Sequence, residues 1–504
     1  MAQRLDVKAI PTVGVYHVCV ILPHGNRSRS RSSIVPSRRL ALFIAVVVAA
    51  LMVALANRSL GDADPDPLVG IHKIQHVIIV MQENRSFDSY FGTYPGADGL
   101  PASVSGRFLS CVPSGKARHC IRPFHDRRDT NNGGPHHAGS AIADINGGKM
   151  NGFINQVTAA QHGLFCRLNP DWPNCAVRPN HTDVMGYHTS REIPNYWAYA
   201  RHYVLQDHMF EPNLGWSLPS HLYAVSGWSA RCRSANPASC TTNLDLTTLG
   251  RPRKGLVYAW TDLTYLLHKA GVSWRYFINV GRTPDCPAGA IACRSHPQTV
   301  TSHSIWNPLP QFTDVSQDGQ RGNVQAAQNY FSDARDGKLP SVSWVIPNER
   351  NSEHPRSKVS RGQEWVTKVV NAAMRSPNWT STAIFVVWDD WGGFYDHVPP
   401  PRIDGSGYGL RVPGLVISPY ARAGMIDHQT LSFDAFLRFI EDDFLAGQRL
   451  NPKTDGRPDP RPTVRENAKP LGNLVNDFNF AQPPRAPFFL NPCPRNYVFH
   501  SHCA

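Results

Sequence analysis

The chain has 504 residues, of which 41% are hydrophobic and 18% are charged. This composition is typical of a folded globular protein with one large domain or two ordinary ones, and it excludes a mainly disordered chain. The formal net charge is +13, but residues 1–39 hold seven Lys or Arg and one Asp, so +6 of it belongs to the N-terminal segment. The remaining mild basicity favours an anionic substrate or lipid surface. It gives no support for nucleic-acid binding, because no basic, aromatic-rich motif accompanies it.

The first 56 residues have the organisation of a secretory signal. A basic stretch, Arg27–Arg39, precedes an unbroken apolar run, Leu40–Ala56, which ends in the A-x-A sequence Ala54-Leu55-Ala56. An uncleaved membrane anchor is the alternative, because 17 apolar residues are at the lower limit for spanning a bilayer. In either case we expect the rest of the chain, after a linker at 57–70, to be secreted or associated with the cell envelope.

Cysteine spacing agrees with export. Cys19 precedes the apolar run, and the other ten Cys form close pairs in segments rich in Pro, Gly, Asn or Ser. An even number of closely spaced Cys indicates local disulfides formed in an oxidising compartment, although the connectivity stays open. The close pairs are Cys111/Cys120, Cys166/Cys175, Cys232/Cys240, Cys286/Cys293 and Cys493/Cys503.

Buried strands alternate with amphipathic helices along the chain. Short apolar runs rich in β-branched residues predict strands at Gln75–Met81, Val342–Ile346, Ala383–Trp388 and Gly414–Ser418. Helical spacing predicts helices at 323–335, 361–375 and Ser432–Phe444, the last with Ser432 as its N-cap. This alternation predicts an α/β sandwich around a largely parallel sheet.

Three longer segments lack this periodicity. Segments 96–180 and 228–310 are loop-rich and contain cysteine pairs, so we interpret them as disulfide-stapled insertions that decorate the sheet. Residues 447–490 are rich in Pro, and we expect them to extend over the domain surface.

Polar side chains follow three of the predicted strands. Glu83-Asn84 follows the first strand, Glu353-His354 lies shortly after the second, and Asp389-Asp390 directly follows the third. In open α/β sheets the ligand site lies beyond the carboxyl ends of the strands, so we expect these residues to converge. Carboxylates that close repel each other unless a proton or a cation neutralises them. The sequence therefore predicts a divalent metal site at this edge.

Each of these clusters has a structural alternative. Glu83-Asn84 could cap the following helix or pair with Arg85, Asp389-Asp390 could form a turn before two glycines, and Glu353-His354 could lie in a surface loop.

Ser217 is the candidate nucleophile. It follows Gly215, and Pro219 suits the first turn of a helix that begins near Ser217. A hydroxyl at a helix N-terminus lies where backbone N–H groups and the helix dipole favour a phosphate. An N-cap role is the alternative. The site is not a nucleophile elbow, because Pro219 stands where G-x-S-x-G requires Gly.

Two histidines in a Gly-rich loop, His136 and His137, are candidates for phosphate binding or for protonation of the leaving group.

Several motifs between about residues 72 and 486 resemble the bacterial phosphoesterase family, which contains phosphatidylcholine-type phospholipases C, acid phosphatases and plant non-specific phospholipases C. They are ENRSFDSYFG, NGGKMNGF, MGYHTSREIPNYW, EPNLGWSLPSHLY, SEHP, WDDWGGFYDHVPPP and YGLRVPGLVISPYARAG. The resemblance implies an alkaline-phosphatase-like α/β fold. It also implies a catalytic domain at 71–486, followed by a tail at 487–504 that holds Cys493/Cys503.

The resemblance also implies roles for single residues. Ser217 matches the Ser or Thr that attacks phosphorus and contacts the metal. His354 matches the histidine of the D/E-H-P motif, which contacts the phosphate or the leaving group, and His136 matches a histidine in the loop before NGGKM. The implied metal ligands besides Ser217 are Glu83, Asn84, Asp389 and Asp390.

The chain departs from the family pattern in two places. Many members have T-x-P-N-R where this chain has Ser217-Leu218-Pro219-Ser220-His221, which puts in doubt any substrate contact by the replaced Asn and Arg. Asp389-Asp390 replaces a common D-E and keeps the carboxylate.

The sequence as a whole predicts an exported, metal-dependent phosphoesterase that attacks phosphate esters with Ser217. Phospholipase C-type cleavage is the leading hypothesis, and acid phosphatase activity on phosphomonoesters is the alternative. An exported binding protein that keeps the fold without catalysis would show a broken set of metal ligands. The expected cofactor is one divalent ion: Ca²⁺, Mg²⁺, Mn²⁺ or Zn²⁺. The expected partners are a phospholipid or small phosphate ester and, peripherally, an anionic membrane surface.

Overall fold

The computed structural model describes residues 68–114, 119–170, 175, 183–246, 257–285, 294–495 and 497–502. They belong to a single unit that begins at Leu68. None of the helices in these ranges is long and apolar enough to cross a membrane. The predicted signal segment, Leu40–Ala56, lies outside the described residues.

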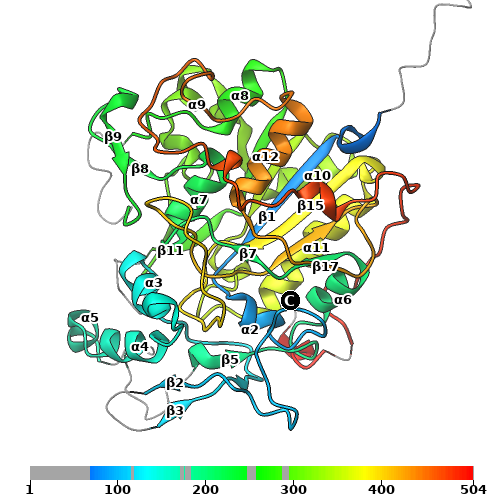
Figure 1. The fold of residues 1–504 in the computed structure, drawn as a ribbon. Coiled ribbons are helices and arrows are strands. Elements are labelled where there is room, and N and C mark those ends of the chain that lie inside the picture. The colour runs from blue at the N-terminus through cyan, green and yellow to red at the C-terminus, as the bar shows by residue number, and fades with distance from the viewer. Residues whose placement is uncertain are drawn as a thin grey trace, which may run out of the picture. The chain divides into compact units, whose positions relative to one another are not determined.

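An eight-stranded sheet forms the centre of this unit, and Figure 1 shows β1 and β15 within it. The strand order is β13-β10-β14-β1-β15-β16-β6-β17. Neighbouring strands are parallel, except that β16 runs antiparallel to both β15 and β6. The predicted largely parallel sheet is therefore confirmed. Its strands are β1 (His76–Gln82), β6 (Val204–Gln206), β10 (Trp274–Ile278), β13 (Val324–Ala326), β14 (Val342–Ile346), β15 (Thr382–Trp388), β16 (Gly414–Ile417) and β17 (Met425–Asp427).

The central strands are apolar on both faces. β1 lies between β14 and β15, with Val77 opposite both Val342 and Ala383. Every residue of β14 and β15 is buried. Parallel strands that are covered on both faces have continuous apolar runs instead of alternating ones, which is why these runs were recognisable in the sequence.

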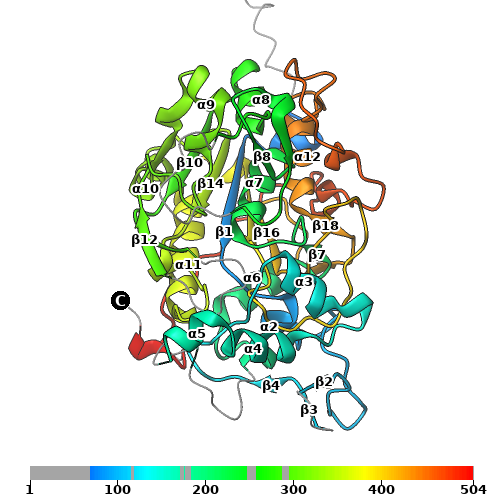
Figure 2. The same ribbon diagram turned by 90° about the vertical axis from the view of Figure 1, so that its left-hand side faces the viewer.

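Helices flank the sheet. α10 (Ala327–Arg335) packs on α11 (Val359–Arg375), which also contacts α6 (Pro194–His202). A separate group consists of α7 (Ser217–Ser226), which contacts both α8 (Leu263–Lys269) and α12 (Phe433–Phe444). The two views show these groups on different sides of the strands (Figures 1 and 2).

Two of the predicted helices differ in how well their predicted starts agree with the structure. α12 is confirmed together with its cap, because the Ser432 side chain accepts a hydrogen bond from the backbone N–H of Asp434. The helix predicted from residue 323 begins only at Ala327. The three residues Val324–Ala326 form β13 instead, because their backbone pairs with the edge of β10.

The segment 96–180 forms a small lobe with its own apolar cluster around Phe153 and Trp391. It contains the disulfides Cys111–Cys120 and Cys166–Cys175. Its helices and strands are α3 (Ala138–Ile145), α4 (Phe153–Gln161), α5 (Leu164–Leu168), β2 (Val112–Pro113), β3 (Cys120–Ile121) and β4 (Phe124–His125). β4 pairs with β5 (Gly186–Tyr187). The prediction of a disulfide-stapled insertion is confirmed for this segment.

The interpretation of 228–310 as a decoration is wrong in one respect, because this segment contributes β10 to the sheet between β13 and β14. Arg275 interrupts the apolar run of this strand and weakens its signal in the sequence; its side chain pairs with Asp333 of α10. The other elements here are β8 (Ala230–Cys232), β9 (Cys240–Thr242), β11 (Gly281–Asp285) and β12 (Arg294–Gln298).

The remaining cysteine pairs are described only in part. Cys232–Cys240 is a disulfide between β8 and β9, as expected. Cys286 and Cys293 lie outside the described residues, as does Cys503, whereas Cys493 is disulfide-bonded.

The Pro-rich segment 447–490 contains no strand or α-helix within its described residues. Arg461 anchors it to the rest of the domain by donating to the carbonyl groups of Ser226 and Thr261. The remaining α-helices and strands are α2 (Phe87–Phe91), α9 (Thr313–Gln317), β7 (Met209–Phe210) and β18 (Leu431–Ser432).

Candidate functional site

Four polar residues gather where two neighbouring central strands end. β1 ends at Gln82 and β15 ends at Trp388, so Glu83-Asn84 and Asp389-Asp390 emerge side by side at the same edge of the sheet. The side chains of all four are fully buried. α7 reaches the same edge and begins at Ser217, which is also buried.

Direct contacts join these residues. The Ser217 hydroxyl lies 3.3 Å from Glu83 Oε2 and 3.2 Å from Asp390 Oδ2. Asn84 Nδ2 donates to Asp390 Oδ1 over 2.6 Å. Asp389 Oδ1 accepts from the backbone N–H groups of Asn84 at 3.0 Å and Asp390 at 2.8 Å. The five residues predicted as metal ligands therefore lie together.

Tight backbone packing holds the two turns that carry these residues. Asn84 has a left-handed backbone, with φ of 51°, which Asn tolerates better than most residues. Gly392 also has a positive φ, and a Cβ placed there would lie 2.8 Å from Asn84 Cβ. A Cβ at Gly393 would lie 2.3 Å from the Cα of Gly134. Gly392 and Gly393 are therefore required by close backbone approach.

Asp389-Asp390 does lead into a turn, because Asp390 Oδ1 accepts from the backbone N–H of Gly392, but the other two local alternatives are not observed. The helix that follows Glu83-Asn84 is capped by Ser86, and Arg85 donates to the Asn84 carbonyl group. The N-cap of α7 is Trp216, so Ser217 is a helical residue whose hydroxyl is free to face the carboxylates.

Burial and mutual repulsion raise the pKa values of the carboxyl groups in this cluster. Burial, reinforced by Asp389 and Asp390, raises the pKa of Glu83 well above its ordinary value. Burial also raises the pKa of Asp389 and of Asp390 to about 7, in the case of Asp389 with a contribution from the neighbouring Asp390. Within the described part of the chain, no Lys or Arg forms an ion pair with any of the three. The cluster thus lacks a compensating protein cation.

The residues fit a metal ion. Asn84 Oδ1 and Asp389 Oδ2 are buried oxygens that receive no hydrogen bond among the described residues. An unpaired buried polar atom costs about 1–3 kcal/mol. Carboxylate, amide and hydroxyl oxygens are the ligands that hard divalent cations prefer. A cation among these oxygens would satisfy the unpaired atoms and neutralise the carboxylates.

His136 and His354 form a neighbouring pair. Their ring centroids are 5.9 Å apart, and the His136 ring also contacts Trp391 at 6.2 Å. His136 Nδ1 lies 2.8 Å from the carbonyl oxygen of Gly134, and His354 Nδ1 lies 3.2 Å from that of Pro355. Burial lowers the pKa of His354 to about 3 and that of His136 also, although the charge of Asp389 opposes the shift for His136. Both rings are therefore neutral at pH 7.

The other two residues of the histidine motifs, His137 and Glu353, form hydrogen bonds outside the carboxylate cluster. His137 is the N-cap residue of α3, and its Nδ1 lies 2.8 Å from Ser140 Oγ. Glu353 does not lie in a surface loop; it is fully buried and accepts hydrogen bonds from Tyr90 and Tyr196, each over 2.6 Å, and from Trp388 Nε1 over 3.0 Å.

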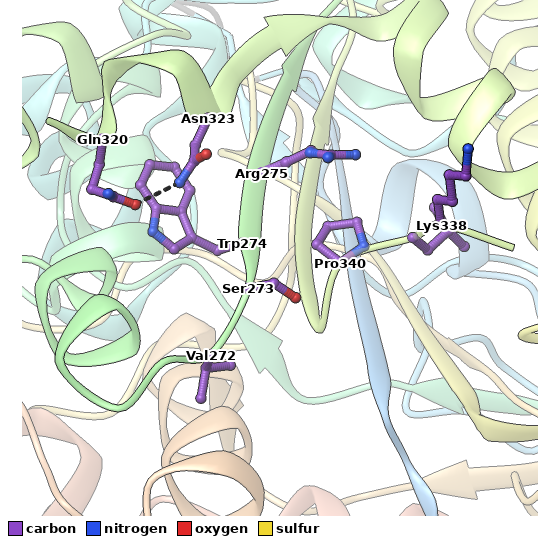
Figure 3. A pocket seen from close by; sticks show the side chains of 9 residues that line it. Val272, Ser273, Trp274, Arg275, Gln320, Asn323, Lys338 and Pro340 are labelled. Carbon is purple, nitrogen blue, oxygen red and sulfur yellow. Dashed lines mark hydrogen bonds between the residues drawn. The ribbon is translucent and has the colours of Figure 1, made fainter. Parts of the chain in front are cut away.

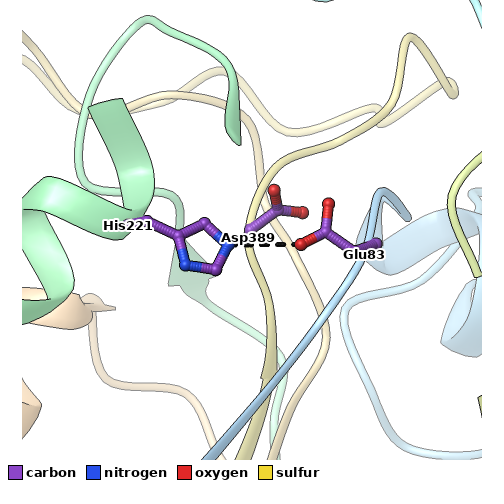
Figure 4. Close-up of side chains that lie close together, drawn as sticks. All are labelled: Glu83, His221 and Asp389. Atoms are coloured by element: carbon purple, nitrogen blue, oxygen red, sulfur yellow. Dashed lines mark hydrogen bonds and ion pairs between the residues drawn. The ribbon is translucent and has the colours of Figure 1, made fainter. Parts of the chain in front are cut away.

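Sequence reasoning missed two residues of the site. His221 lies one helical turn after Ser217, and its Nε2 lies 3.2 Å from Glu83 Oε1 (Figure 4). Burial lowers the pKa of His221 to about 3. Glu211 is buried near Asp390, and its pKa is raised well above the ordinary value, chiefly by burial. The i, i+4 spacing of Ser217 and His221 on a predicted helix was the available signal for His221.

A second acidic cluster, formed by Asp88, Asp396 and His397, already contains a cation. Arg411 lies 2.9 Å from Asp396 and 3.2 Å from Asp88. Burial opposes protonation of His397, but its hydrogen bond to Asp88 and the charges of Asp88 and Asp396 together outweigh burial and raise its pKa. This cluster therefore holds the loop 396–411 and needs no metal.

A surface pocket lies at the opposite edge of the sheet (Figure 3). Its lining includes Ser273 and Trp274 at the start of β10, and Pro340 just before β14. Since these strands run parallel to β1, the pocket is at the amino ends of the strands, away from Glu83.

Residues 74–445 match the model of the Phosphoesterase family, and the chain belongs to this family. Phospholipase C B of Mycobacterium tuberculosis (strain ATCC 25618 / H37Rv) is 28% identical over 448 residues, which cover 82% of this chain and 78% of the relative. Non-hemolytic phospholipase C of Burkholderia pseudomallei (strain K96243) is 27% identical, and the alignment covers 88% of this chain and 63% of the relative's length.

These similarities identify the chain as a phosphoric ester hydrolase. Among solved structures, one is described as a protein in the alkaline phosphatase superfamily from Vibrio parahaemolyticus. The match covers 78% of this chain and 74% of the Vibrio chain, with 11% identity and a TM-score of 0.34. The α/β fold class itself follows from the sheet topology.

Proposed function

We propose that this phosphoric ester hydrolase is an exported, metal-dependent enzyme of phospholipase C type, with Ser217 as its nucleophile. The observation that carries the proposal is the position of the Ser217 hydroxyl, 3.3 Å from Glu83 and 3.2 Å from Asp390 at the start of α7. A serine hydroxyl in contact with two carboxylates has an acceptor for its proton.

The start of α7 suits a bound phosphoryl group. The backbone N–H groups of Ser217 and Leu218 belong to the first helical turn, where no intrahelical acceptor exists. They and the helix dipole favour an anion beside the Ser217 hydroxyl. The proton of this hydroxyl would pass to Asp390 or Glu83 as the oxygen attacks phosphorus.

Glu83, Asn84, Asp389, Asp390 and Ser217 would hold the divalent ion. When bound, such an ion supplies positive charge that lowers the pKa of a coordinated hydroxyl and polarises a phosphoryl oxygen. The oxygen ligands allow Ca²⁺, Mg²⁺ or Mn²⁺, and Zn²⁺ also binds carboxylates. A binding protein without catalysis is disfavoured, because it would be expected to lack part of this ligand set.

His354 and His136 would contact the phosphate or the leaving group. Both rings are neutral in the free protein, so each would first donate a hydrogen bond from an N–H group. The negative charge of a bound phosphate ester beside them would raise their pKa values and favour protonation of the leaving oxygen.

The substrate class and location extend the proposal. The relatives named phospholipase C support a phospholipid substrate. The net positive charge of the chain would favour peripheral contact with an anionic lipid surface. Export is supported by the leader at 1–56 and by three local disulfides. The catalytic domain would then be residues 71–486, with 487–504 as a tail.

The test compares hydrolysis of phosphatidylcholine vesicles with that of p-nitrophenyl phosphate. Ser217→Ala should lower kcat/KM on the preferred substrate by about 1,000-fold or more. Ser226→Ala is the matched control, because it removes a buried hydroxyl from the opposite end of the same helix. Activity on the monoester alone would favour the acid phosphatase alternative. Near-normal turnover by Ser217→Ala would exclude Ser217 as the nucleophile.

A further inference from the structure

His221 faces the carboxylates of the site from α7. It is fully buried and lies one turn after Ser217, so that both side chains project from the same face of the helix. One ring nitrogen of His221 and one carboxylate oxygen each of Glu83 and Asp389 all lie within 4.8 Å of one another. Figure 4 shows the three side chains converging from α7 and from the segments that follow β1 and β15.

The hydrogen bonds around His221 fix which ring nitrogen carries the proton. The Tyr276 hydroxyl donates its only proton to the carbonyl oxygen of Trp306 over 2.9 Å. The same phenol oxygen lies 3.3 Å from His221 Nδ1, so it can only accept there. A neutral imidazole carries one N–H, which is therefore at Nδ1. His221 Nε2 then directs a lone pair at Glu83 Oε1, 3.2 Å away.

Two lone-pair atoms at this distance need a proton or a cation between them. A proton shared by His221 Nε2 and Glu83 Oε1 would satisfy this pair alone. It would leave Asp389 Oδ2 without a hydrogen-bond donor among the described residues. A metal ion with bonds of about 2.1 Å brings its ligand atoms to within about 3–4.3 Å of one another, which this cluster can reach with small movements. One ion would satisfy all three atoms.

We propose that His221 Nε2 is a ligand of the metal ion, alongside Glu83 and Asp389, and that it makes the site select Zn²⁺ or a first-row transition ion over Ca²⁺ and Mg²⁺. Imidazole nitrogen suits Zn²⁺, Fe²⁺ and related ions, whereas Ca²⁺ and Mg²⁺ bind oxygen. The Tyr276 oxygen orients the ring through Nδ1–H, as partners of metal-bound histidines do. This proposal rests on the metal dependence proposed above.

The first experiment reads the ligand directly in the full-length protein. The chain is stripped with a chelator, loaded with Mn²⁺, and examined by pulsed EPR before and after ¹⁵N-histidine labelling. We expect a nitrogen hyperfine coupling that changes with the isotope. A bound Mn²⁺ with no histidine coupling would overturn the ligand assignment while leaving the proposed function intact. If the wild-type protein bound no divalent ion, both proposals would fail.

The second experiment measures binding of Zn²⁺ and Ca²⁺ by titration calorimetry. His221→Gln should raise the Kd for Zn²⁺ at least about tenfold and change that for Ca²⁺ less than about threefold. His303→Gln is the matched control, because His303 also contacts a tyrosine hydroxyl, that of Tyr258 at 2.9 Å, outside the site. Equal Zn²⁺ affinity in His221→Gln and wild type would contradict the proposal.

A third variant tests the orientation of the ring. Tyr276→Phe keeps the aromatic ring but removes the oxygen that accepts from His221 Nδ1. We expect the Kd for Zn²⁺ to rise about tenfold. An unchanged Kd would overturn the assignment of the proton to Nδ1, and with it the proposal.

Discussion

Replacing Asp390 with Asn should stabilise the metal-free protein and at the same time remove most of its activity. Asp390 Oδ1 accepts from Asn84 Nδ2 at 2.6 Å and from the backbone N–H of Gly392 at 2.7 Å. Asp390 Oδ2 faces the Ser217 hydroxyl at 3.2 Å. An Asn amide has the same shape, so its oxygen can keep the first two contacts and its NH₂ can donate to Ser217. The substitution removes the charge and preserves the packing.

The size of the effect follows from the pKa of Asp390, which burial raises from 3.8 to about 7. A difference of about three pKa units corresponds to about 4 kcal/mol. The folded state keeps its proton between about pH 4 and pH 7 while the unfolded state loses it, so stability falls as the pH rises through this window. Below about pH 4 the penalty is absent, and above about pH 7 it is complete.

The pKa values of Glu83 and Asp389 are raised as well, so the cost of ionisation is distributed over three carboxyl groups. We therefore expect the Asn variant to gain about 1–4 kcal/mol in free energy of unfolding at pH 8 without metal. A domain of this size has an unfolding entropy of about 1 kcal/mol per kelvin, so Tm should rise by about 1–4 °C. Activity should fall because one anionic ligand and one of the two proton acceptors of Ser217 are lost.

The assay is differential scanning calorimetry of chelator-treated wild type and variant at pH 4 and pH 8, together with turnover at pH 8 after addition of metal. Asp126→Asn is the matched control. Asp126 is also buried, but its contacts with Arg128, which lies 2.6 Å away, outweigh burial and lower its pKa, so its neutralisation should destabilise the protein at pH 8. A lower Tm for metal-free Asp390→Asn at pH 8, or a Tm difference independent of pH, would refute the charge-repulsion reasoning.

Three further predictions concern the site and its support. Chelation should lower the wild-type Tm more at pH 8 than at pH 5, since protons replace the cation at low pH; equal shifts would argue against a carboxylate-bound ion. Glu353→Ala should cost about 3–6 kcal/mol in urea unfolding, because it leaves three buried donors unpaired, and a loss below about 1 kcal/mol would contradict this. Gly393→Ala should greatly reduce soluble expression, since its Cβ would lie 2.3 Å from Gly134 Cα; a normal yield with a wild-type Tm would count against that close approach.

Local sequence signals were sufficient for the core of the fold. The runs Val342–Ile346 and Ala383–Trp388 are apolar on both faces, which identifies central parallel strands without any knowledge of their partners. The rule that ligand sites lie beyond the carboxyl ends of such strands then placed Glu83-Asn84 and Asp389-Asp390 at one edge, and this is where they lie. β10 escaped prediction because Arg275 interrupts its apolar pattern.

The residues that complete the site could be identified only from the packing of distant segments. His221 is 138 positions from Glu83 in the chain, and their contact exists because α7 packs with its first turns against the end of β1. Helical periodicity shows that Ser217 and His221 lie on one face of α7. It does not show which segment of the chain packs against that face. For Glu353 the sequence left two readings open, a place at the ligand edge or a surface loop, whereas three buried donors make it part of the core. Sequence periodicity determines elements, and the packing between elements determines which side chains meet.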